Sequence, residues 1–424
     1  MLTRILHLNE RLCTLIALLK PTLSAPQLRH VTRIADALLV TDAPKTLAEL
    51  DRQFVDGVDP SNIADALRIA PWTAQDIRQP LMAFMMRTAL ERMRQQGQKP
   101  YVFINLDDSL AIKDPGTRCL EAVDWHFYHS HKGKKRDRIQ NGMEYIECNV
   151  VVGDCSFTFA VQPYLRKRTV RRLNRQRPAD RRLHFVSKPR LARRILEQCR
   201  ALIPTGVPVR VHFDSWYASA DLIQYIRRQD WHAVFRIEPN RRLSGQRVDQ
   251  RASAQRHRRY VPVDITVADG SKRTYLVRSM IGRFHKVPFD VCVLVSRRHY
   301  RDPFPVYFAS TDLTLSPQQA LQGYAKRWNC EVDNWYLKER LGLGGFRVHS
   351  YEAIDKFCAI VLLSLNYLQW RLITATDGKA RNCADVIRQH RDEHAQDWLR
   401  GACQEVLASG DIEAVLQRYL PPAA

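Results

Sequence analysis

The sequence predicts an α/β protein, and three observations indicate this class. Strand-like apolar runs begin at Tyr101 after a helical stretch, strand and helix patterns then alternate to about residue 238, and further strand patterns precede an apolar helical run at 357–368. The chain has 424 residues and is 45% hydrophobic. This is enough for a sizeable core and suggests two or three domains.

Residues 1–98 read as an N-terminal helical region. The segment 46–49, Thr-Leu-Ala-Glu, has capping-box spacing, and Asp59-Pro60 marks a turn before a short helix at 61–67. Two short helices joined by a turn fit a helix-turn-helix DNA reader, and they fit an ordinary helical bundle equally well. This pair of helices has few basic residues, so the pattern favours the helical bundle. Recognition of DNA ends by this region is a hypothesis.

Residues 99–238 form the first part of the expected core. An apolar run at 101–106 has the pattern of a buried strand, and Gly153-Asp154 has the residue types of a hairpin turn. The expected order is strand, strand, strand, helix, strand, helix, strand. The ranges are 101–106, 145–152, 156–162, 191–202, 207–213, 218–228 and 233–237.

Residues 239–302 read as a mostly β insertion into this core. A polar, basic segment at 241–259 precedes strand patterns at 260–267, 273–280 and 291–295, and Asp269-Gly270 has the residue types of a hairpin turn. A strand at 306–309 then returns to the core, which residues 303–376 complete. Residues 377–424 are expected to form a C-terminal helical region.

Three acidic residues occupy informative places in this order. Asp108 ends the first strand, Asp214 ends the fourth, and Glu331 lies on a late helix, which is the layout of a ribonuclease-H-like fold. Neighbouring Asp107 and Asp108 must point to opposite faces of their strand; Asp108, followed by Ser109, is the preferred candidate. Asp214 alone could cap a helix instead. Together the three carboxylates could hold two divalent ions.

The segment 324–338 gathers unlike polar groups on one predicted helix face. At about 100° per residue, Tyr324, Arg327, Glu331 and Lys338 fall within an arc of about 60°. A phenol, a guanidinium, a carboxylate and an ammonium make a poor core face but suit a divalent metal beside a phosphate backbone. The alternative is a solvated face with an i,i+4 Arg–Glu pair.

The charge of the chain favours a polyanionic partner. Its formal net charge is +22 and its pI is near 9.8, which is typical of proteins that bind nucleic acid. Between residues 166 and 194, thirteen Lys or Arg residues face one acid, Asp180, and a shorter basic loop lies at 132–136. The expected phosphate contacts are Arg166, Lys167, Arg168, Arg171 and Arg172.

Other features predict a cytoplasmic protein without a membrane span. The ten cysteines form no CxxC pair, so they read as reduced thiols rather than as a zinc site. The N-terminus lacks a signal-peptide layout. The apolar run at 357–368 is too short to cross a membrane and predicts a buried helix.

From about residue 100 to 370 the chain resembles bacterial insertion-sequence DDE transposases of the IS-four type. That family has the helix signature Tyr-x2-Arg-x3-Glu-x6-Lys, which Tyr324, Arg327, Glu331 and Lys338 match. Its first motif, an Asp before Thr or Ser after an apolar strand, corresponds to the segment 106–109. Its second, an Asp before an aromatic turn, corresponds to the segment 213–217.

The resemblance implies that the protein cuts transposon ends and joins the released 3′-hydroxyl to target DNA. It implies Asp108, Asp214 and Glu331 as catalytic metal ligands, two Mg²⁺ ions with Mn²⁺ as a substitute, double-stranded terminal inverted repeats and target DNA as partners, and a homodimer in the synaptic complex. The alternatives are a metal-dependent endonuclease of the same fold without strand transfer, and a repurposed DNA-binding protein without catalysis.

The cleavage route stays open at this stage. Some relatives form a DNA hairpin and stack a flipped base on an aromatic side chain, often a Trp of the β insertion. This chain has no Trp between Trp231 and Trp328, so Phe284, Phe289 or Tyr300 would have to substitute.

Overall fold

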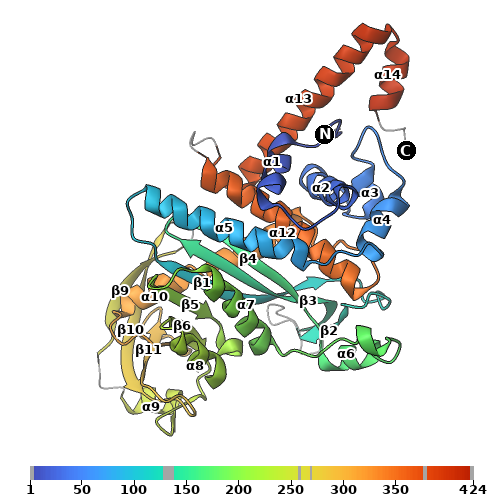
Figure 1. Cartoon of the computed structure of the whole chain (residues 1–424). Helices are drawn as coiled ribbons and strands as arrows, with labels where there is room; N and C mark the ends of the chain where they lie inside the picture. The colour runs from blue at the N-terminus through green and yellow to red at the C-terminus, as the bar shows by residue number, and fades with distance from the viewer. Residues whose placement is uncertain (1–3, 128–137, 256–258, 268–269, 376–379, 421–424) are drawn as a thin grey trace.

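The computed structural model describes residues 4–127, 138–255, 259–267, 270–375 and 380–420. The basic loop at 132–136 and Asp269 of an expected hairpin turn lie outside these residues. One large mixed sheet crosses the molecule, with a helical layer above it in Figure 1.

The sheet contains ten strands in one continuous hydrogen-bonded array. In spatial order they are β2 (Asp124–Phe127), β3 (Ile139–Val152), β1 (Val102–Ile112), β5 (Val209–Phe213), β6 (His232–Ile237), β12 (Val306–Ser310), β11 (Val291–Arg297), β10 (Lys272–Gly282) and β9 (Val261–Thr266), with β4 (Cys155–Tyr164) also paired to β3. A separate hairpin joins β7 (Arg242–Leu243) to β8 (Gln246–Arg247).

Strand direction changes across the centre of the sheet. β1, β5 and β6 run parallel to one another, whereas β3 is antiparallel to β1 and β12 is antiparallel to β6. All five residues of β5 are buried, as expected for a central strand covered on both faces. This arrangement brings the carboxyl ends of β1 and β5 to the same edge of the sheet.

Different helices cover the two faces of the sheet. α10 (Pro317–Ala325), α11 (Trp328–Trp335) and α12 (Tyr351–Thr374) lie on the face that carries the side chains of Asn105 and Asn149. α7 (Lys188–Leu202) lies on the opposite face and reaches Asp108, while α8 (Ala220–Arg228) packs beside α7 and β6.

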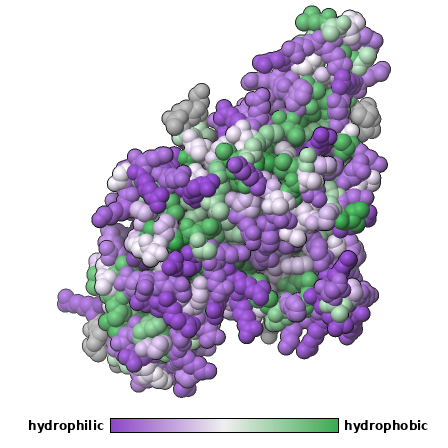
Figure 2. Space-filling view, viewed as in Figure 1, coloured by the Kyte–Doolittle hydropathy of each residue, from purple (hydrophilic) through white to green (hydrophobic). Residues whose placement is uncertain are grey.

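The N-terminal helices share a core with α12. They are α1 (Glu10–Leu19), α2 (Ala25–Val40), α3 (Leu47–Asp51), α4 (Pro60–Arg68) and α5 (Gln75–Gln95), and α2, α4 and α5 contact α12. α13 (Cys383–Ser409) leaves this layer as a long arm and turns back through α14 (Ile412–Tyr419) (Figure 1). Hydrophobic residues reach the surface along that arm in Figure 2, among them Leu407 and Ile412.

Most of the expected elements are confirmed, with shifted ends. The seven elements predicted between residues 101 and 237 occur in the predicted order, and Thr46 caps α3 by accepting a hydrogen bond from the Glu49 amide at 3.2 Å. The strands of the insertion continue the main sheet through β12. The short elements that were not predicted include β2, the β7–β8 hairpin, α6 (Lys167–Leu173), α9 (Val248–Ala254) and the 3-10 turns at Ala179–Arg181 and Ser215–Tyr217.

The prediction of a buried helix at 357–368 is confirmed. α12 is long and apolar enough to pass as a membrane span by length and composition, but 83% of that window is buried inside the protein. Every residue from Phe357 to Leu368 is at most 2% exposed. α12 is therefore the central core helix, between the sheet and the N-terminal helices.

This burial predicts a large stability cost for truncating α12. Leu365→Ala removes a fully buried side chain and should lower the free energy of unfolding by about 2–5 kcal/mol. Leu407→Ala, on the exposed arm, is the matched control because Leu407 is 85% exposed, and it should change the free energy by less than about 0.5 kcal/mol. Urea unfolding measures both, and similar costs would contradict this account of the core.

Candidate active site

Two acidic positions are brought together by the parallel pairing of β1 and β5. In this register Asn105 lies opposite His212, and their side chains are hydrogen bonded at 2.9 Å between Oδ1 and Nδ1. They therefore point to the same face. Alternation along β1 then puts Asp107 on this face, which α10 and α11 cover, and Asp214 directly follows the last residue of β5, at the same edge of the sheet.

Arg327 links Asp107 to the helix that carries Glu331. Its Nη1 forms a close ion pair with Asp107, and its Nη2 lies 3.5 Å from Oε1 of Glu331. Asp107 is buried, whereas the Glu331 side chain is 46% exposed. The carboxylate of Glu331 is thus open to a ligand arriving from solvent.

Asp108 points to the face of β1 opposite Asp107. Its carboxylate accepts a hydrogen bond from Lys188 Nζ at 2.7 Å, and Lys188 also contacts Glu144 at 2.5 Å. Glu144 in turn pairs with Nδ1 of His126 at 2.9 Å. Asp108 thus pairs with Lys188, whereas Asp107 is the residue that pairs with Arg327.

Burial and crowding of carboxylates perturb the acids. Burial is the largest cause that raises the pKa of Asp107, to about 7; Arg327 opposes the rise, and Glu331, Asp108 and Asp214 add to it. Burial followed by the charge of Asp108 also raises the pKa of Asp214. Carboxylates that repel one another in a partly dry site would gain from a divalent cation between them.

Asp214 also has the capping role that the sequence left open. It follows β5 and accepts a hydrogen bond from the backbone N–H of Trp216 at 2.9 Å, at the start of a 3-10 turn, Ser215–Tyr217. One carboxylate oxygen makes this bond. Capping fixes the side chain without using up its ability to bind a cation.

The predicted single helix from Tyr324 to Lys338 is wrong in detail. Tyr324 lies near the end of α10, Arg327 lies in the two-residue turn before α11, and Lys338 lies in a π-helical turn, Tyr336–Arg340. The backbone stays helical through the junctions, so the groups remain near one side. π turns insert an extra residue and are frequent at functional sites.

Lys338 and Tyr324, at the two ends of this segment, have different surroundings. Lys338 Nζ donates to the hydroxyl of Ser109 at 3.1 Å, on the same strand face as Asp107. Tyr324 packs edge-on against Phe308 and His212, and burial raises its pKa to about 12. Lys338 thus lies near the acidic site, whereas the Tyr324 ring contributes mainly to packing.

Sequence reasoning missed the buried polar groups that fix α11. Asp333 accepts hydrogen bonds from Asn149, Thr158 and Gln369 at 2.8, 2.8 and 3.0 Å, and Asn334 accepts one from Tyr145 at 2.6 Å. One sequence signal pointed to the inward position of Asp333. It lies two residues after Glu331, and this spacing puts the two side chains on different sides of a helix.

Glu147 is a second missed group. It lies opposite Asp107 in the β1–β3 register, is fully buried, and neither carboxyl oxygen has a hydrogen-bond partner among the described residues. Burial, followed by the charges of Asp333 and Asp107, raises its pKa well above the ordinary value. The raised pKa favours the neutral form of Glu147, in keeping with its lack of a positively charged partner among the described residues.

Some side chains of the basic segment 166–194 bind other parts of the protein. Arg168 pairs with Asp124, and Arg166 donates to the carbonyl oxygen of Trp125. Lys167, Arg171 and Arg172 are exposed on α6, and among the described residues they have no ion-pair partner. These three side chains can meet an external anion, as can the exposed Arg175, Arg182, Arg190 and Arg194 of the same segment.

The aromatic candidates for base stacking in the insertion also differ. Phe284 is 3% exposed and stacks within the core, so it is unavailable to a base, whereas Tyr300 is 67% exposed. Phe289 is partly buried against the core. Of the three, Tyr300 is the only one with a largely open ring.

Residues 186–367 match the family model described as "Transposase DDE domain". The match covers less than half of the chain and includes Asp214 and Glu331. It begins after β1, so β1 lies outside it. It supports a DDE transposase as the class of protein, and hence an enzyme of the nuclease and transposase kind with DNA as substrate and a general dependence on divalent metal. No curated protein matches the chain.

The pKa of Asp107 predicts a pH-dependent affinity for divalent cations. The raised pKa means that Asp107 is protonated below pH 7, and a cation needs the ionised form. Affinity for Mn²⁺ should therefore fall about tenfold per pH unit below pH 7 and level off above it. Calorimetric titration at pH 6, 7 and 8 measures this, with Asp107→Asn as the control that should lose the pH step. Equal affinity at pH 6 and 8 in the wild type would contradict the assignment.

Proposed function

We propose that this protein is a DNA transposase of the IS-four type that cuts transposon ends and joins the 3′-hydroxyl to target DNA. The observation that carries the proposal is the contact of Arg327 with both Asp107 and Glu331, at the sheet edge where β5 ends in Asp214. We assign Asp107, Asp214 and Glu331 as the catalytic carboxylates.

The strand order supports a ribonuclease-H-like catalytic core. β4, β3, β1, β5 and β6 lie side by side in this order, with β1, β5 and β6 parallel and β3 antiparallel to β1. In such a sheet, functional groups gather at the carboxyl ends of parallel strands. The acids lie at that edge.

The residues at this edge fit two Mg²⁺ ions, with Mn²⁺ as a substitute. Hard divalent cations prefer carboxylate oxygens, and the raised pKa values of Asp107 and Asp214 reflect burial together with the crowding of carboxylates. When bound, such ions would supply activation of the attacking oxygen and stabilisation of the leaving oxygen. Asp107, Asp214 and Glu331 would hold them.

Neighbouring side chains have separate roles in this proposal. Arg327 holds Asp107 and Glu331 in place and can turn toward a phosphate once their charge is neutralised. Lys338, near Ser109, would contact the DNA backbone beside the scissile phosphate. Lys188 binds Asp108 on the far face and keeps that charge from competing for the cation.

The proposed binding partners follow from the positive charge of the chain and from the transposase class. Double-stranded DNA is the expected ligand of a chain with net charge +22, first as the terminal inverted repeats and then as target DNA. Two transposon ends must be processed together, so we propose a homodimer in the synaptic complex. We propose a cytoplasmic location, and recognition of DNA ends by the N-terminal helices stays a hypothesis.

The test uses purified protein and a labelled duplex carrying the DNA that flanks the gene, with Mg²⁺ or Mn²⁺. Wild type should nick the ends and join them to target DNA on a denaturing gel. Asp107→Asn, Asp214→Asn and Glu331→Gln should each lower cleavage at least 10³-fold, roughly the scale of losing a transition-state electrostatic contact, while DNA binding persists. Asp108→Asn is the matched control and should cost about tenfold or less.

The remaining outcomes separate the alternatives. Cleavage without joining would favour an endonuclease of the same fold, and binding without cleavage by wild type would favour a repurposed DNA-binding protein. Loss of cleavage in Asp108→Asn with retention in Asp107→Asn would reverse the assignment of the first carboxylate.

The exposed bases of α6 predict a salt-dependent contribution to DNA affinity. Replacing Lys167, Arg171 and Arg172 together by Ala should weaken binding to specific and random duplexes alike, because phosphate contacts carry no sequence information. The slope of log affinity against log salt should fall by about 2 to 3. Fluorescence anisotropy over a salt series measures this, with Arg29→Ala, Lys99→Ala and Arg400→Ala combined as a charge-matched control. An unchanged slope in the α6 variant would remove α6 from the interface.

A further inference from the structure

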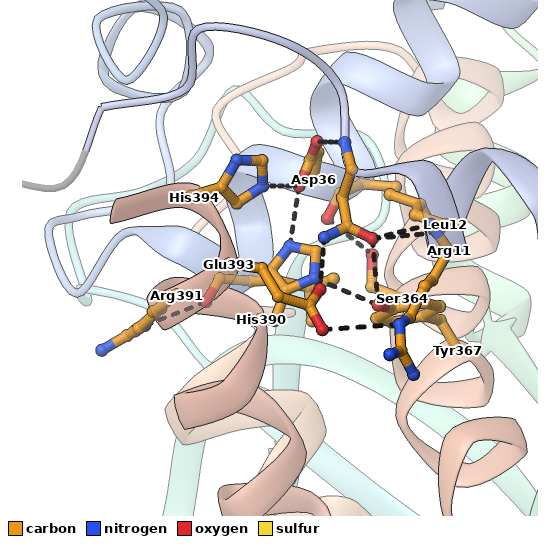
Figure 3. A network of polar contacts seen from close by, with 12 residues as sticks. Arg11, Leu12, Asp36, Ser364, Tyr367, His390, Arg391, Glu393 and His394 are labelled. Carbon is orange, nitrogen blue, oxygen red and sulfur yellow. Dashed lines mark hydrogen bonds and ion pairs between the residues drawn. The ribbon is translucent and has the colours of Figure 1, made fainter. Parts of the chain in front are cut away.

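A buried cluster far from the acidic edge combines two histidines and one aspartate. Figure 3 shows His390 and His394 on α13 pointing at Asp36 of α2. Oδ1 of Asp36 lies 2.7 Å from Nε2 of His390 and 2.8 Å from Nε2 of His394. The exposed fractions are 0% for Asp36 and His390 and 2% for His394.

The geometry of the three side chains is that of a ligand set. His390 and His394 are separated by four positions, which puts both rings on one face of α13. One ligand atom from each residue lies within 4.8 Å of the others. Two imidazoles and a carboxylate are ligands that suit zinc and related divalent ions.

Outer contacts orient two of these ligands, Asp36 and His390. Oδ2 of Asp36 accepts the backbone N–H of Asn9 at 2.9 Å, which leaves Oδ1 directed at the histidines. Nδ1 of His390 lies 3.2 Å from the hydroxyl of Tyr367, which also accepts from Arg371 at 3.0 Å. A hydrogen-bonded second nitrogen is the usual companion of a metal-bound histidine, because it fixes the tautomer and the ring orientation.

Asp36 is ionised in these surroundings. Burial raises its pKa, but the hydrogen bonds and charges of His390 and His394 more than offset that rise and hold the pKa well below its ordinary value. A buried carboxylate needs a positive partner. Either a proton held on the histidines or a bound cation can supply that charge.

A cavity gives solvent a path to the cluster. Its volume is about 390 Å³, and His394 lines it together with His7, Asn9, Glu393 and Asp397. The cavity can admit an ion and can hold a water molecule as a fourth ligand. His7 and Asp397 pair with each other at 3.1 Å on its exposed rim.

We propose that Asp36, His390 and His394 form a binding site for one divalent transition-metal ion of the zinc class. Zinc–nitrogen and zinc–oxygen bonds of about 2.0–2.2 Å in tetrahedral geometry set the ligand atoms about 3.3 Å apart. The separations of 2.7 and 2.8 Å therefore need to open by about half an ångström. Nδ1 of His390 then donates its proton to Tyr367, and both Nε2 atoms face the ion.

The site would fasten three segments that are far apart in the sequence. It joins α2 to α13 and, through Tyr367, to α12, at the base of the arm formed by α13 and α14 (Figures 1 and 3). Its role is structural and does not depend on the proposed function, since none of the acidic-edge residues takes part.

The test measures metal content in the full-length protein. Protein from zinc-supplemented medium is dialysed against excess Mg²⁺, which occupies carboxylate sites without displacing zinc from histidine, and is then analysed by mass spectrometry. The expected result is about one zinc per chain in wild type and a loss of at least tenfold in His390→Gln and His394→Gln. Glu331→Gln and the exposed His299→Gln should keep their zinc. Zinc-free wild type, or unchanged zinc in both histidine variants, would overturn the proposal.

If the variants fail to fold, a second measurement on the wild-type protein tests whether the site binds zinc. Removing zinc with a chelator should lower the unfolding temperature by several degrees, and adding Zn²⁺ should restore it. Co²⁺ in place of zinc should give visible absorption bands of a nitrogen and oxygen ligand field. An unfolding temperature indifferent to chelator and zinc, with no such bands, would establish a metal-free ion-paired triad instead.

Discussion

The parallel pairing of β1 with β5 is the constraint on which the acidic site depends. It fixes Asn105 opposite His212, and the period of two along β1 then puts Asp107 on the same face as Asn105, while Asp214 follows the end of β5 at the same edge. A slip of one residue would turn one acid to the opposite face. Because both strands are buried, their apolar residues resist such a slip: Val102, Ile104 and Leu106 in β1, and Val209, Val211 and Phe213 in β5.

The third acid depends on how α11 docks on this sheet. Cys330, Asp333 and Asn334 face inward, and Asp333 is surrounded by donors from β3, β4 and α12. Burial raises the pKa of Asp333 to about 6, and its three hydrogen bonds oppose that rise. Leaving any of these buried donors unpaired would cost about 1–3 kcal/mol. The inward residues therefore fix the rotation of α11, and that rotation leaves Glu331 at the edge beside Arg327.

Much of this arrangement was predictable from local sequence patterns. Buried strands have the sequence pattern of apolar runs, so the seven elements predicted between residues 101 and 237 and the strands of the insertion were found, whereas the short β2 and α6 were missed. Alternation says only that Asp107 and Asp108 point to opposite faces of β1, so the sequence could not choose between them. The break between α10 and α11 and the π turn after Trp335 also left no periodic signal. The triad of Asp36, His390 and His394 joins positions more than 350 residues apart, and only the packing of α2 on α13 brings them together.

The central claim is that divalent ions bind between Asp107, Asp214 and Glu331, on the face of β1 that α11 covers. A crystal structure with Mn²⁺, read by anomalous scattering, tests it most directly. The account predicts anomalous density bounded by these three carboxylates, with Asp108 still paired to Lys188. Density on the Asp108 face of β1, with Lys188 displaced and Asp107 still paired to Arg327, would contradict it.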